Sequence, residues 1–448
     1  MNRDIYHNLV EWKSSPRRKP LVLRGARQTG KTYILNEFGR CEYENVFYCN
    51  FEEDPALEGL FTGKLSPTRI LELLSIYHDS QIRPGRDLII FDEVQACNAA
   101  LNCLKYFCES ASEYHIAAAG SLLGVKLSSP KSFPVGKVTF LDLHPMTFLE
   151  FLEATGSDRY RRLLENISEL APLASTFHVD IVDLLRTYYC VGGMPEAVEC
   201  FARTRDLRAV RGIQEDILSA YVLDFAKHAP SADIPKLSLI WDSVPAQLAR
   251  ENKKFLYSAV RKGARAKGYE NALKWLEDAG LLLRCYAVSM ARHPLKGYMD
   301  RNCFKIYSLD IGLLGAMAGV PLDVLVRGDD LFREYGGAFV ESYVAQQLTA
   351  LGMDLYYWRS SGKIAELDFL CEIEGAICPL EVKAGTNPRS KSLRSYDNQF
   401  NPSVLGRSTL LNLKHDGKIC NIPLYAISLL RELLGLALSG PKGSGTAS

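Results

Sequence analysis

The sequence predicts an α/β protein in which two α/β regions flank a mainly helical segment. The first third alternates short apolar runs with helical stretches, a pattern typical of a parallel sheet. From about residue 145 to 230 apolar residues recur at helical spacing, and after about residue 325 a helix precedes several short apolar strands. The length of 448 residues agrees with this division, because domains of about 150 residues suggest roughly three of them.

The first region is expected to contain five strands. Their runs are continuously apolar rather than alternating, which favours strands that helices cover on both faces. They lie at residues 20–24, 45–51, 87–91, 115–119 and 137–141.

Helices are expected to dominate the middle of the chain. We interpret the Gly-Gly-Met-Pro run at 192–195 as a helix break. Residues 243–290 favour a winged helix, in which three short helices precede a hairpin that starts near residue 281. The helices predicted for this part lie at 146–154, 158–170, 178–189, 208–226, 243–251, 255–262 and 268–279.

The last region is predicted to be a second, mixed α/β domain. A helix at 336–351 precedes short strands, and the Gly/Ser-rich tail at 440–448 is expected to be disordered. The strands lie at 354–358, 366–372, 376–382 and 407–412.

The charges nearly cancel over the whole chain but not within its parts. The formal net charge is +1, which by itself indicates neither a nucleic-acid nor a membrane partner. The balance is −2 for residues 1–155, −3 for 156–249, +8 for 250–305, −8 for 306–382 and +6 for 383–448. Any polyanion partner is therefore expected at particular places on the chain.

The sequence contains no signal for export or for a membrane. The twelve cysteines include no Cys-x-x-Cys pair and the eight histidines do not cluster, so neither zinc nor a disulfide framework is expected. The first residues are charged where a signal peptide needs an apolar run, and no stretch reaches the roughly 18 apolar residues of a membrane helix. We expect a cytoplasmic protein with reduced thiols and no membrane partner.

Residues 25–32 have the sequence of a phosphate-binding loop between a predicted strand and a predicted helix. They read Gly25, Ala26, Arg27, Gln28, Thr29, Gly30, Lys31 and Thr32, a complete GxxxxGK[ST] motif. The glycines let backbone N–H groups turn toward phosphate oxygens at the positive end of a helix. Lys31 is expected to contact the β- and γ-phosphates of ATP, and Thr32 to offer its hydroxyl to Mg²⁺.

The apolar strand at 87–91 leads into two carboxylates, Asp92 and Glu93. Asp92 is expected to hold Mg²⁺ through water, and Glu93 to orient and deprotonate the attacking water. An NTPase that activates water needs the second acid, whereas a small-molecule kinase does not. The extra strand at 45–51 is typical of P-loop ATPases of the additional-strand class, in which another strand ends in a polar sensor. Ser121 fits that sensor, and an ordinary Gly-Ser turn is the alternative.

Four stretches, GARQTGKT, IIFDEVQ, AAAGS and GKVTFLDLHPMTFLEFL, resemble a family of bacterial and archaeal AAA-like ATPases. That family joins an N-terminal ATPase to an uncharacterised C-terminal region, and the resemblance spans almost the whole chain. It implies a homo-oligomer, because a neighbouring copy commonly supplies an arginine finger. One position departs from the family, Gly136-Lys137 in place of Gly-Arg. Lysine cannot fork two phosphate oxygens as arginine does, so either hydrolysis is weak or another arginine takes this role.

The block of charge +8 falls on the predicted winged helix. A basic face on such a fold is the electrostatic pattern of contact with the phosphate backbone of DNA. The alternative is a small helical lid whose charges are solvated or face the acidic block at 306–382. The clustered residues are Lys253, Lys254, Arg261, Lys262, Arg265 and Lys267.

A second acidic constellation lies near the C-terminus. Glu341 is on a predicted helix, Glu366-Leu-Asp368 on a strand and Glu381-Val-Lys383 on the next strand, a spacing that resembles the PD-(D/E)xK, or restriction-endonuclease-like, nuclease core. Asp368 and Glu381 are expected to hold Mg²⁺, which would polarise a scissile phosphate. Lys383 would stabilise the hydroxide or the transition-state charge, and Glu341 would reach in from the helix.

A basic run formed by Lys383, Arg389, Lys391 and Arg394 suits DNA phosphates beside that site. Two alternatives remain: a domain of this type that binds without cutting, and charged residues that merely decorate solvated strands. The second is disfavoured, since four charges that converge between otherwise apolar strands are costly to bury.

We therefore predict a P-loop AAA-like ATPase domain at 1–155, a helical lid with a winged helix at 156–320, and a restriction-endonuclease-like domain at 321–439. The predicted function is an ATP- and Mg²⁺-dependent ATPase coupled to a nuclease-like domain that acts on DNA. The alternative is an ATP-dependent signalling or assembly switch whose C-terminal domain binds a partner without cleaving.

Overall fold

The computed structural model describes residues 1–121, 123–127, 136–250, 254–321, 336–360, 365–385 and 390–439. Lys253, Arg389 and the tail at 440–448, for which predictions were made, lie outside the described residues. The chain divides into two compact units: Met1–His144 with Lys274–Leu281, and Pro145–Leu273 with Leu282–Ser448. Within the described ranges, no helix has both the length and the apolar character needed to cross a membrane.

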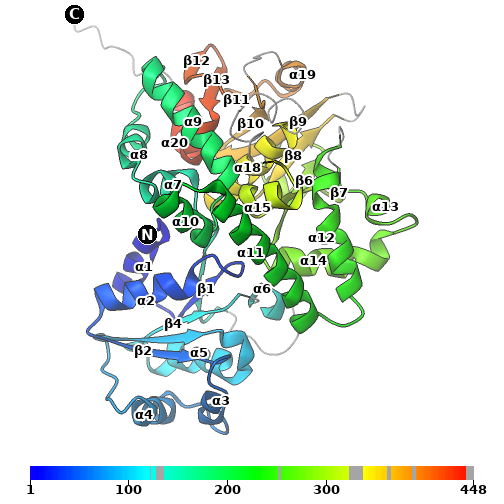
Figure 1. Ribbon diagram of the computed structural model, residues 1–448. Helices are drawn as coiled ribbons and strands as arrows, with labels where there is room; N and C mark the ends of the chain where they lie inside the picture. Colours follow the sequence, from blue (N-terminus) through cyan, green and yellow to red (C-terminus); the bar gives the residue numbers. More distant parts are fainter. Residues whose placement is uncertain are drawn as a thin grey trace, which may run out of the picture. The chain divides into compact units, whose positions relative to one another are not determined.

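The first unit is built on a parallel sheet of five strands in the order β2-β3-β4-β1-β5 (Figure 1). All five predicted strands are present, with ends that differ from the prediction by at most two residues. The strands are β1 Leu21–Arg24, β2 Asn45–Asn50, β3 Asp87–Asp92, β4 His115–Ala119 and β5 Thr139–Asp142. The helices are α1 Ile5–Ser14, α2 Lys31–Glu42, α3 Ala56–Leu60, α4 Pro67–Tyr77, α5 Asn98–Ser110 and α6 Leu123–Leu127, with a 3-10 turn η1 at Val94–Ala96.

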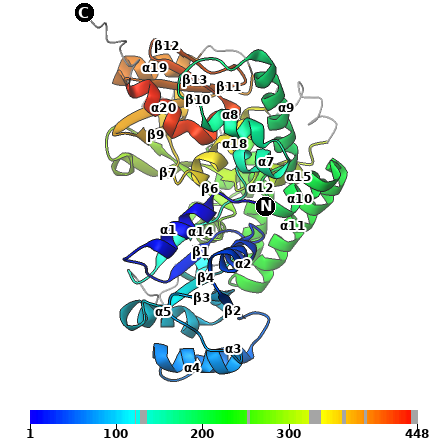
Figure 2. The ribbon, with the colours of Figure 1, turned by 90° about the vertical axis from the view of Figure 1, so that its left-hand side faces the viewer.

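Helices cover both faces of this sheet, as its continuously apolar strands predict. On the buried strand β3, Leu88 and Ile90 pack in one apolar cluster with residues of α1 and α2, whereas Ile89 and Phe91 pack in another with residues of α3, α4 and α5. Figures 1 and 2 show the two helix layers on opposite sides of the sheet. Burial of each such side chain contributes about 1.5–3 kcal/mol to the stability of the fold. The central strands therefore fix the positions of the residues at their carboxyl ends.

The second unit contains a helical part and a mixed sheet. The helices before the sheet are α7 Phe148–Ala154, α8 Asp158–Glu165, α9 Ser175–Val191, α10 Pro195–Thr204, α11 Leu207–His228, α12 Ile234–Leu248 and α13 Tyr257–Val260. Helix α14 spans Ala266–Asp278, and its residues from Lys274 onward belong to the first unit. The later helices are α15 Ile311–Met317, α18 Gly336–Ala350, α19 Lys391–Phe400 and α20 Leu430–Ser439, with 3-10 turns η2 Leu295–Tyr298 and η3 Leu424–Leu429.

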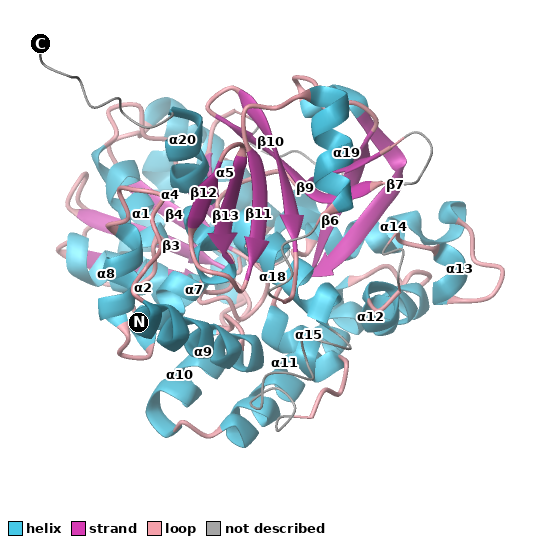
Figure 3. Ribbon diagram, turned by 90° about the horizontal axis from the view of Figure 1, so that it is seen from above, coloured by secondary structure: helices cyan, strands magenta, loops and turns pink. Residues whose placement is uncertain are grey.

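The mixed sheet has eight strands in the order β12-β13-β11-β10-β9-β8-β6-β7. They are β6 Leu282–Val288, β7 Met299–Ser308, β8 Tyr356–Arg359, β9 Glu366–Ile373, β10 Ala376–Val382, β11 Leu405–Thr409, β12 Lys414–Asp416 and β13 Ile419–Pro423. Strands β8, β9 and β10 are antiparallel neighbours, and α19 leads from β10 to the parallel strand β11 (Figure 3). Helix α18 packs on β6, β7 and β10.

Three helices followed by a hairpin occur where the winged helix was predicted, as α12, α13, α14, β6 and β7. The hairpin is not a separate two-stranded wing, because β6 also pairs with β8. One sheet therefore takes strands from both sides of the predicted boundary between residues 320 and 321. Helix α12 begins at Ile234 rather than near 243, and α8 ends at Glu165 rather than at 170. Helices α10, α15, α19 and α20 and strands β12 and β13 were not predicted.

The Gly-Gly-Met-Pro run breaks a helix, as predicted, and also forms a tight contact inside the second unit. Helix α9 ends before Gly192, whose φ is 73°, and α10 begins at Pro195. The N–H of Gly193 donates to Oδ2 of the buried Asp310 at 2.6 Å. A Cβ on Gly193 would lie 2.1 Å from the carbonyl oxygen of Met146, so only glycine fits this position.

Candidate functional site

The predicted phosphate-binding loop lies between β1 and α2, at the edge where the parallel strands end. Gly25, Gln28 and Gly30 have φ values of 153°, 64° and 93°, so the backbone curls in the left-handed region that favours glycine. A Cβ on Gly25 would lie 2.2 Å from the carbonyl oxygen of Leu143, which explains the need for glycine at the start of the loop.

Lys31 begins α2 and bends back over this loop. Its side chain is buried, and Nζ donates to the carbonyl oxygens of Gly25 at 3.0 Å and Ala26 at 2.7 Å. Burial lowers the pKa of Lys31 to about 8, although the carboxylates of Glu93 and Asp92 act in the opposite direction. The Lys31 ammonium thus donates to carbonyl oxygens of the loop, at a position suited to binding an anionic ligand.

The carboxylate of Asp92, at the end of β3, joins three elements of the site. Its Oδ2 accepts from the Thr32 hydroxyl at 2.6 Å and from the Tyr48 hydroxyl at 2.8 Å. Its Oδ1 accepts from the N–H of Glu93 at 2.9 Å. The structure therefore brings together Thr32 and Asp92, the two residues predicted to hold Mg²⁺ at this site. Tyr48, on β2, was not predicted, because its role depends on pairing between β2 and β3.

Glu93 is oriented by a strained backbone and by two side chains. Its φ of 47° lies in the left-handed region, which is uncommon for residues other than glycine. Oε2 accepts from the Ser121 hydroxyl at 3.2 Å and also from the side-chain amide of Gln95. The predicted pair Glu93 and Ser121 thus meets, and Gln95 is an addition to it. A Cβ on Gly120 would lie 1.9 Å from Oε1 of Gln95, so the Gly-Ser sequence leaves room for this amide.

The arginines near this loop already form hydrogen bonds with other groups of the protein. The guanidinium of Arg3 is buried and donates to the carbonyl oxygens of Thr29 at 2.9 Å and His144 at 2.6 Å. Arg24 forms two hydrogen bonds with Asp142, at 2.8 and 2.7 Å. Sequence reasoning missed Arg3, because only the fold brings the N-terminus to the loop.

Two further charged residues of the first unit are also ion-paired. Arg27 lies 3.8 Å from a carboxylate oxygen of Glu52. Lys137, which stands where the family resemblance leads one to expect arginine, pairs with Glu109 at 2.9 Å.

The residues around the loop fit a magnesium nucleotide. Mg²⁺ prefers hard oxygen ligands and keeps several waters, and the Thr32 hydroxyl and Asp92 carboxylate are such ligands. The curled backbone has no side chains to fill its concave side at Gly25 and Gly30, and the Lys31 ammonium lies against it.

In the second unit, three of the four residues of the predicted nuclease-like site, Asp368, Glu381 and Lys383, lie together. Phe369 of β9 pairs with Leu380 of β10, so Asp368 and Glu381 are the next residues on adjacent strands. Nζ of Lys383 lies 2.6 Å from Oε1 of Glu381, and the N–H that follows Glu381 donates to Oδ2 of Asp368 at 2.8 Å.

Glu341 lies near enough to influence the pKa of Glu381 and of Lys383. Burial acts to lower the pKa of Lys383, but Glu381, Asp368 and Glu341 together hold it above its ordinary value. Burial raises the pKa of Glu381, with Lys383 acting in the opposite direction. Oε2 of Glu381 makes no hydrogen bond of normal geometry within the described residues, although the Ser390 side chain lies near enough to lower the pKa of Glu381.

A fifth residue, Lys305 of β7, belongs to this cluster and was not predicted. Its Nζ lies 2.7 Å from Oε1 of Glu366 and 3.7 Å from Oε2 of Glu341. The Tyr307 hydroxyl donates to the same oxygen of Glu341 at 3.2 Å. The sequence signal that could have indicated it is a lysine inside the apolar run Phe-Lys-Ile-Tyr, because a buried lysine needs a carboxylate partner.

The carboxylates of this cluster do not form a metal cage of their own. Among the described residues, no three Asp, Glu, His or Cys side chains are grouped so that they could hold a metal ion. A cation held by Asp368 and Glu381 would therefore take its other ligands from water or a substrate.

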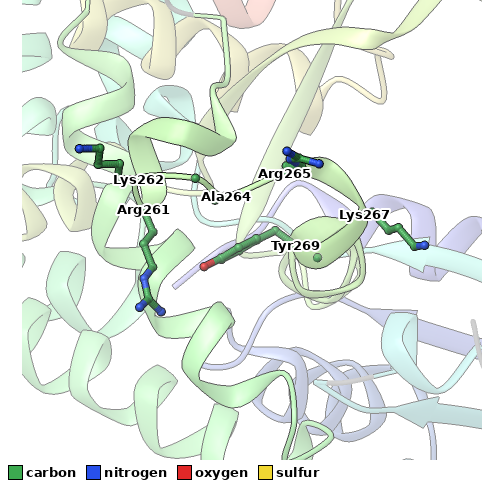
Figure 4. A pocket seen from close by; sticks show the side chains of 8 residues that line it. Arg261, Lys262, Ala264, Arg265, Lys267 and Tyr269 are labelled. Carbon is green, nitrogen blue, oxygen red and sulfur yellow. The ribbon is translucent and has the colours of Figure 1, made fainter.

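The basic segment, residues 261–269, runs from the end of α13 into the first turn of α14 and forms an open hollow of about 580 Å³ (Figure 4). Figure 4 shows Arg261 and Tyr269 reaching toward the same space, while Lys262 and Lys267 extend outward. The part of the chain that the structure describes provides no ion-pair partner for any of the four cations that line it, Arg261, Lys262, Arg265 and Lys267. All four are exposed.

Comparison with protein families identifies the first unit. Residues 17–152 match the model of a family described as an AAA domain. Residues 182–323 and 336–425 match two families that are each described as a domain of unknown function. The chain therefore contains an AAA-type P-loop ATPase domain, whereas its later domains are not assigned an activity by these matches. No curated protein sequence matches the chain.

Several solved structures are similar to the chain. The Walker-type ATPase PABY2304 of Pyrococcus abyssi is 14% identical, with 70% of this chain and 95% of that chain covered and a TM-score of 0.44. The ORC2 protein of Aeropyrum pernix, in ADPNP–ADP complexes, is 16% identical over 72% and 89% of the two chains, with a TM-score of 0.34. The ORC1 protein of Aeropyrum pernix, in complex with DNA, is 12% identical over 71% and 91%, with a TM-score of 0.28.

Removal of the Arg3 side chain is expected to loosen the phosphate-binding loop. Arg3→Ala leaves the carbonyls of Thr29 and His144 without a charged donor, and each such hydrogen bond is worth about 1.5–3 kcal/mol. We expect a lower melting temperature and weaker ATP binding, measured by thermal denaturation with and without ATP. Arg17→Ala, at an exposed position, is the control. An unchanged ATP affinity in Arg3→Ala would show that the loop holds its shape without this contact.

Proposed function

We propose that the protein hydrolyses ATP at the edge of the five-stranded sheet and uses this reaction to control a nuclease-like domain that acts on DNA. The observation that carries the proposal is the joined network of Thr32, Asp92, Glu93 and Ser121 next to Lys31. All twelve cysteines are unpaired, which supports a reducing compartment such as the cytoplasm.

Each residue of the network has a role in this reaction. Lys31 would exchange the loop carbonyls for phosphate oxygens, and the backbone N–H groups of the loop would hold the phosphates in line. Bound Mg²⁺, held by Thr32 and through water by Asp92, would supply charge neutralisation on the phosphates. Glu93, with Oε2 held by Ser121 and Gln95, would accept a proton from the attacking water.

Self-association is part of the proposal. Arg24, next to the loop, and Arg27, within it, are paired with Asp142 and Glu52, and Lys137 is paired with Glu109. An arginine from a second copy would complete charge stabilisation at the γ-phosphate, an effect that is large in other NTPases.

DNA is the proposed partner of the second unit. Four exposed cations around Tyr269 offer phosphate contacts and an aromatic surface, a combination that suits nucleic-acid strands. The cluster of Asp368, Glu381 and Lys383 has the charges required to cleave a phosphodiester with a divalent cation.

Helix α14 provides a physical connection between ATP and the basic segment. It begins at Ala266, within that segment, and ends at Asp278. A Cβ on Gly280, two residues later, would lie 3.4 Å from the N atom of Ala26 in the phosphate-binding loop. A change in that loop on ATP binding would therefore reach the end of α14 directly.

The alternative function is an ATP-dependent switch that assembles with a partner and does not cut. The convergent carboxylates are compatible with it, because a buried charge cluster can also specify structure without catalysis. Cleavage assays separate the two functions.

Substitution of Lys31 and of Glu93 is expected to separate ATP binding from hydrolysis. Lys31→Ala should lose both, because the phosphates lose their main cation. Glu93→Gln should bind ATP normally but hydrolyse it about 10²–10⁴-fold more slowly, since the general base is absent. Phosphate release and fluorescent-nucleotide binding measure the two steps. Glu58→Gln, on exposed α3, is the matched control, and normal turnover by either site variant would refute the assignment.

Neutralisation of the basic segment is expected to weaken DNA binding in a salt-dependent way. Arg265→Ala/Lys267→Ala should reduce the slope of log K against log[salt] by about 2, as expected for the loss of two phosphate contacts. Fluorescence anisotropy with labelled duplex and single-stranded DNA between about 50 and 200 mM salt tests this. Arg203→Ala/Arg208→Ala, on exposed positions of the same unit, should leave the slope unchanged. Equal slopes for both double variants would argue against this binding surface.

Removal of Asp368 is expected to abolish divalent-dependent DNA cleavage and to spare ATPase activity. Asp368→Ala removes one of the two carboxylates proposed to hold the cation, whereas the ATP site is unaltered. The assay uses duplex, single-stranded and branched DNA with Mg²⁺ or Mn²⁺, with and without ATP. Asp416→Ala, an exposed carboxylate in the same sheet, is the control. If the wild-type protein cuts none of these substrates, the switch function replaces the nuclease function.

A further inference from the structure

The buried ammonium of Lys305 lies within the carboxylate cluster of the second unit. Its side chain is only 2% exposed, and its Nζ contacts the carboxylates of Glu366 and Glu341. It also lies 4.8 Å from the centre of the Tyr357 ring, which adds a cation–π contact. Burial acts to lower the pKa of Lys305, but Glu341, Glu366 and Asp368 hold it well above its ordinary value.

The carboxylate of Glu341 is held by Lys305 and by a neighbouring tyrosine. Its Oε2 accepts from the Tyr307 hydroxyl and faces the Lys305 ammonium, and its side chain is 7% exposed. An oxygen held in this way is a poor metal ligand, because a cation would have to displace a buried ammonium. Glu341 was predicted to reach into the nuclease-like site, and the structure turns this carboxylate toward Lys305.

We propose that the Lys305 ammonium takes the role that a divalent metal ion would have between Glu341 and Glu366. Lys305 is thus a positioning residue that orients these two carboxylates. The inference rests on the proposed nuclease-like function and deepens it, because it limits the number of ions that the site takes. Four carboxylates, of Glu341, Glu366, Asp368 and Glu381, and two ammonium groups, of Lys305 and Lys383, leave a formal charge of −2. One divalent cation between Asp368 and Glu381 balances that charge, and a second would exceed it.

Removal of the Lys305 charge should create a need for another cation. Without Lys305, the buried carboxylate of Glu341 and the half-buried carboxylate of Glu366 lose their common counter-ion, so the cluster must either take up a metal ion or rearrange. Lys305→Met keeps most of the volume without the charge, whereas Lys305→Arg keeps the charge and is the matched control.

The experiment counts Mn²⁺ bound to the full chain without nucleotide, by electron paramagnetic resonance of the free ion. We expect Lys305→Met to bind one Mn²⁺ more than the wild type, and Lys305→Arg to bind the same number as the wild type. Mn²⁺ should also raise the melting temperature of Lys305→Met by more than that of the wild type. A folded Lys305→Met that gains no Mn²⁺, or a Lys305→Arg that does gain one, would overturn the proposal.

Lys305→Gln covers the case in which Lys305→Met fails to fold. Its amide can still donate to both carboxylates but carries no charge, so it too should gain one Mn²⁺, and an unchanged count would overturn the proposal. Asp368→Asn tests the proposed nuclease site separately, since it should bind one Mn²⁺ fewer than the wild type. If Asp368→Asn binds as many Mn²⁺ ions as the wild type, the metal site at Asp368 and Glu381 is refuted. A gain of one Mn²⁺ in Lys305→Met would still support the role of Lys305. ATP hydrolysis should be unchanged in all Lys305 variants.

Discussion

The first unit depends on one buried carboxylate, that of Asp92. It lies at the end of a strand whose two faces are both covered by helices, and a carboxylate in such a place must be satisfied by donors from the protein. Thr32 comes from the first turn of α2, Tyr48 from β2, and the third donor is the N–H of Glu93. Satisfying this single group therefore sets the distance between the phosphate-binding loop and the neighbouring strands, and it places Glu93 beside them.

The second unit meets the same constraint in another way. Its carboxylates lie between apolar strands, where unpaired charges are costly, and the chain supplies its own ammonium groups. Lys383 comes from the strand end next to Glu381, whereas Lys305 comes from β7, at the far edge of the sheet order. The first unit satisfies its carboxylate with neutral hydroxyl and amide donors, which leaves that site ready for a cation and a nucleotide. The second satisfies much of its charge internally, which reduces the demand for metal.

Patterns that are local in sequence predicted the parts of the fold that local chemistry determines. The five strands of the first sheet were predicted because each is a continuous apolar run, and the phosphate-binding loop because its glycines and lysine must be adjacent. The convergence of Asp368 and Glu381 followed from two neighbouring strands. Arg3, Tyr48 and Lys305 were missed for the opposite reason. Each acts through a partner that only the tertiary fold brings near, as Lys305 does with Glu341 and Glu366, and the pairing of β6 with β8 across the expected domain boundary has the same cause.

The segregation of charge along the chain now has two physical explanations rather than one. Residues 250–305 carry an excess of eight positive charges, and the neighbouring block at 306–382 carries the matching negative excess. Lys305 pairs with Glu341 and Glu366 of that acidic block, so part of the excess is used inside the protein. The cations around the hollow at Tyr269 have no such partners among the described residues, and they are exposed. Internal pairing therefore accounts for Lys305 at the end of the basic block, whereas the segment at 261–269 gathers four exposed cations around one hollow. A partner that reads phosphates is accordingly expected at that segment and not over the whole basic block.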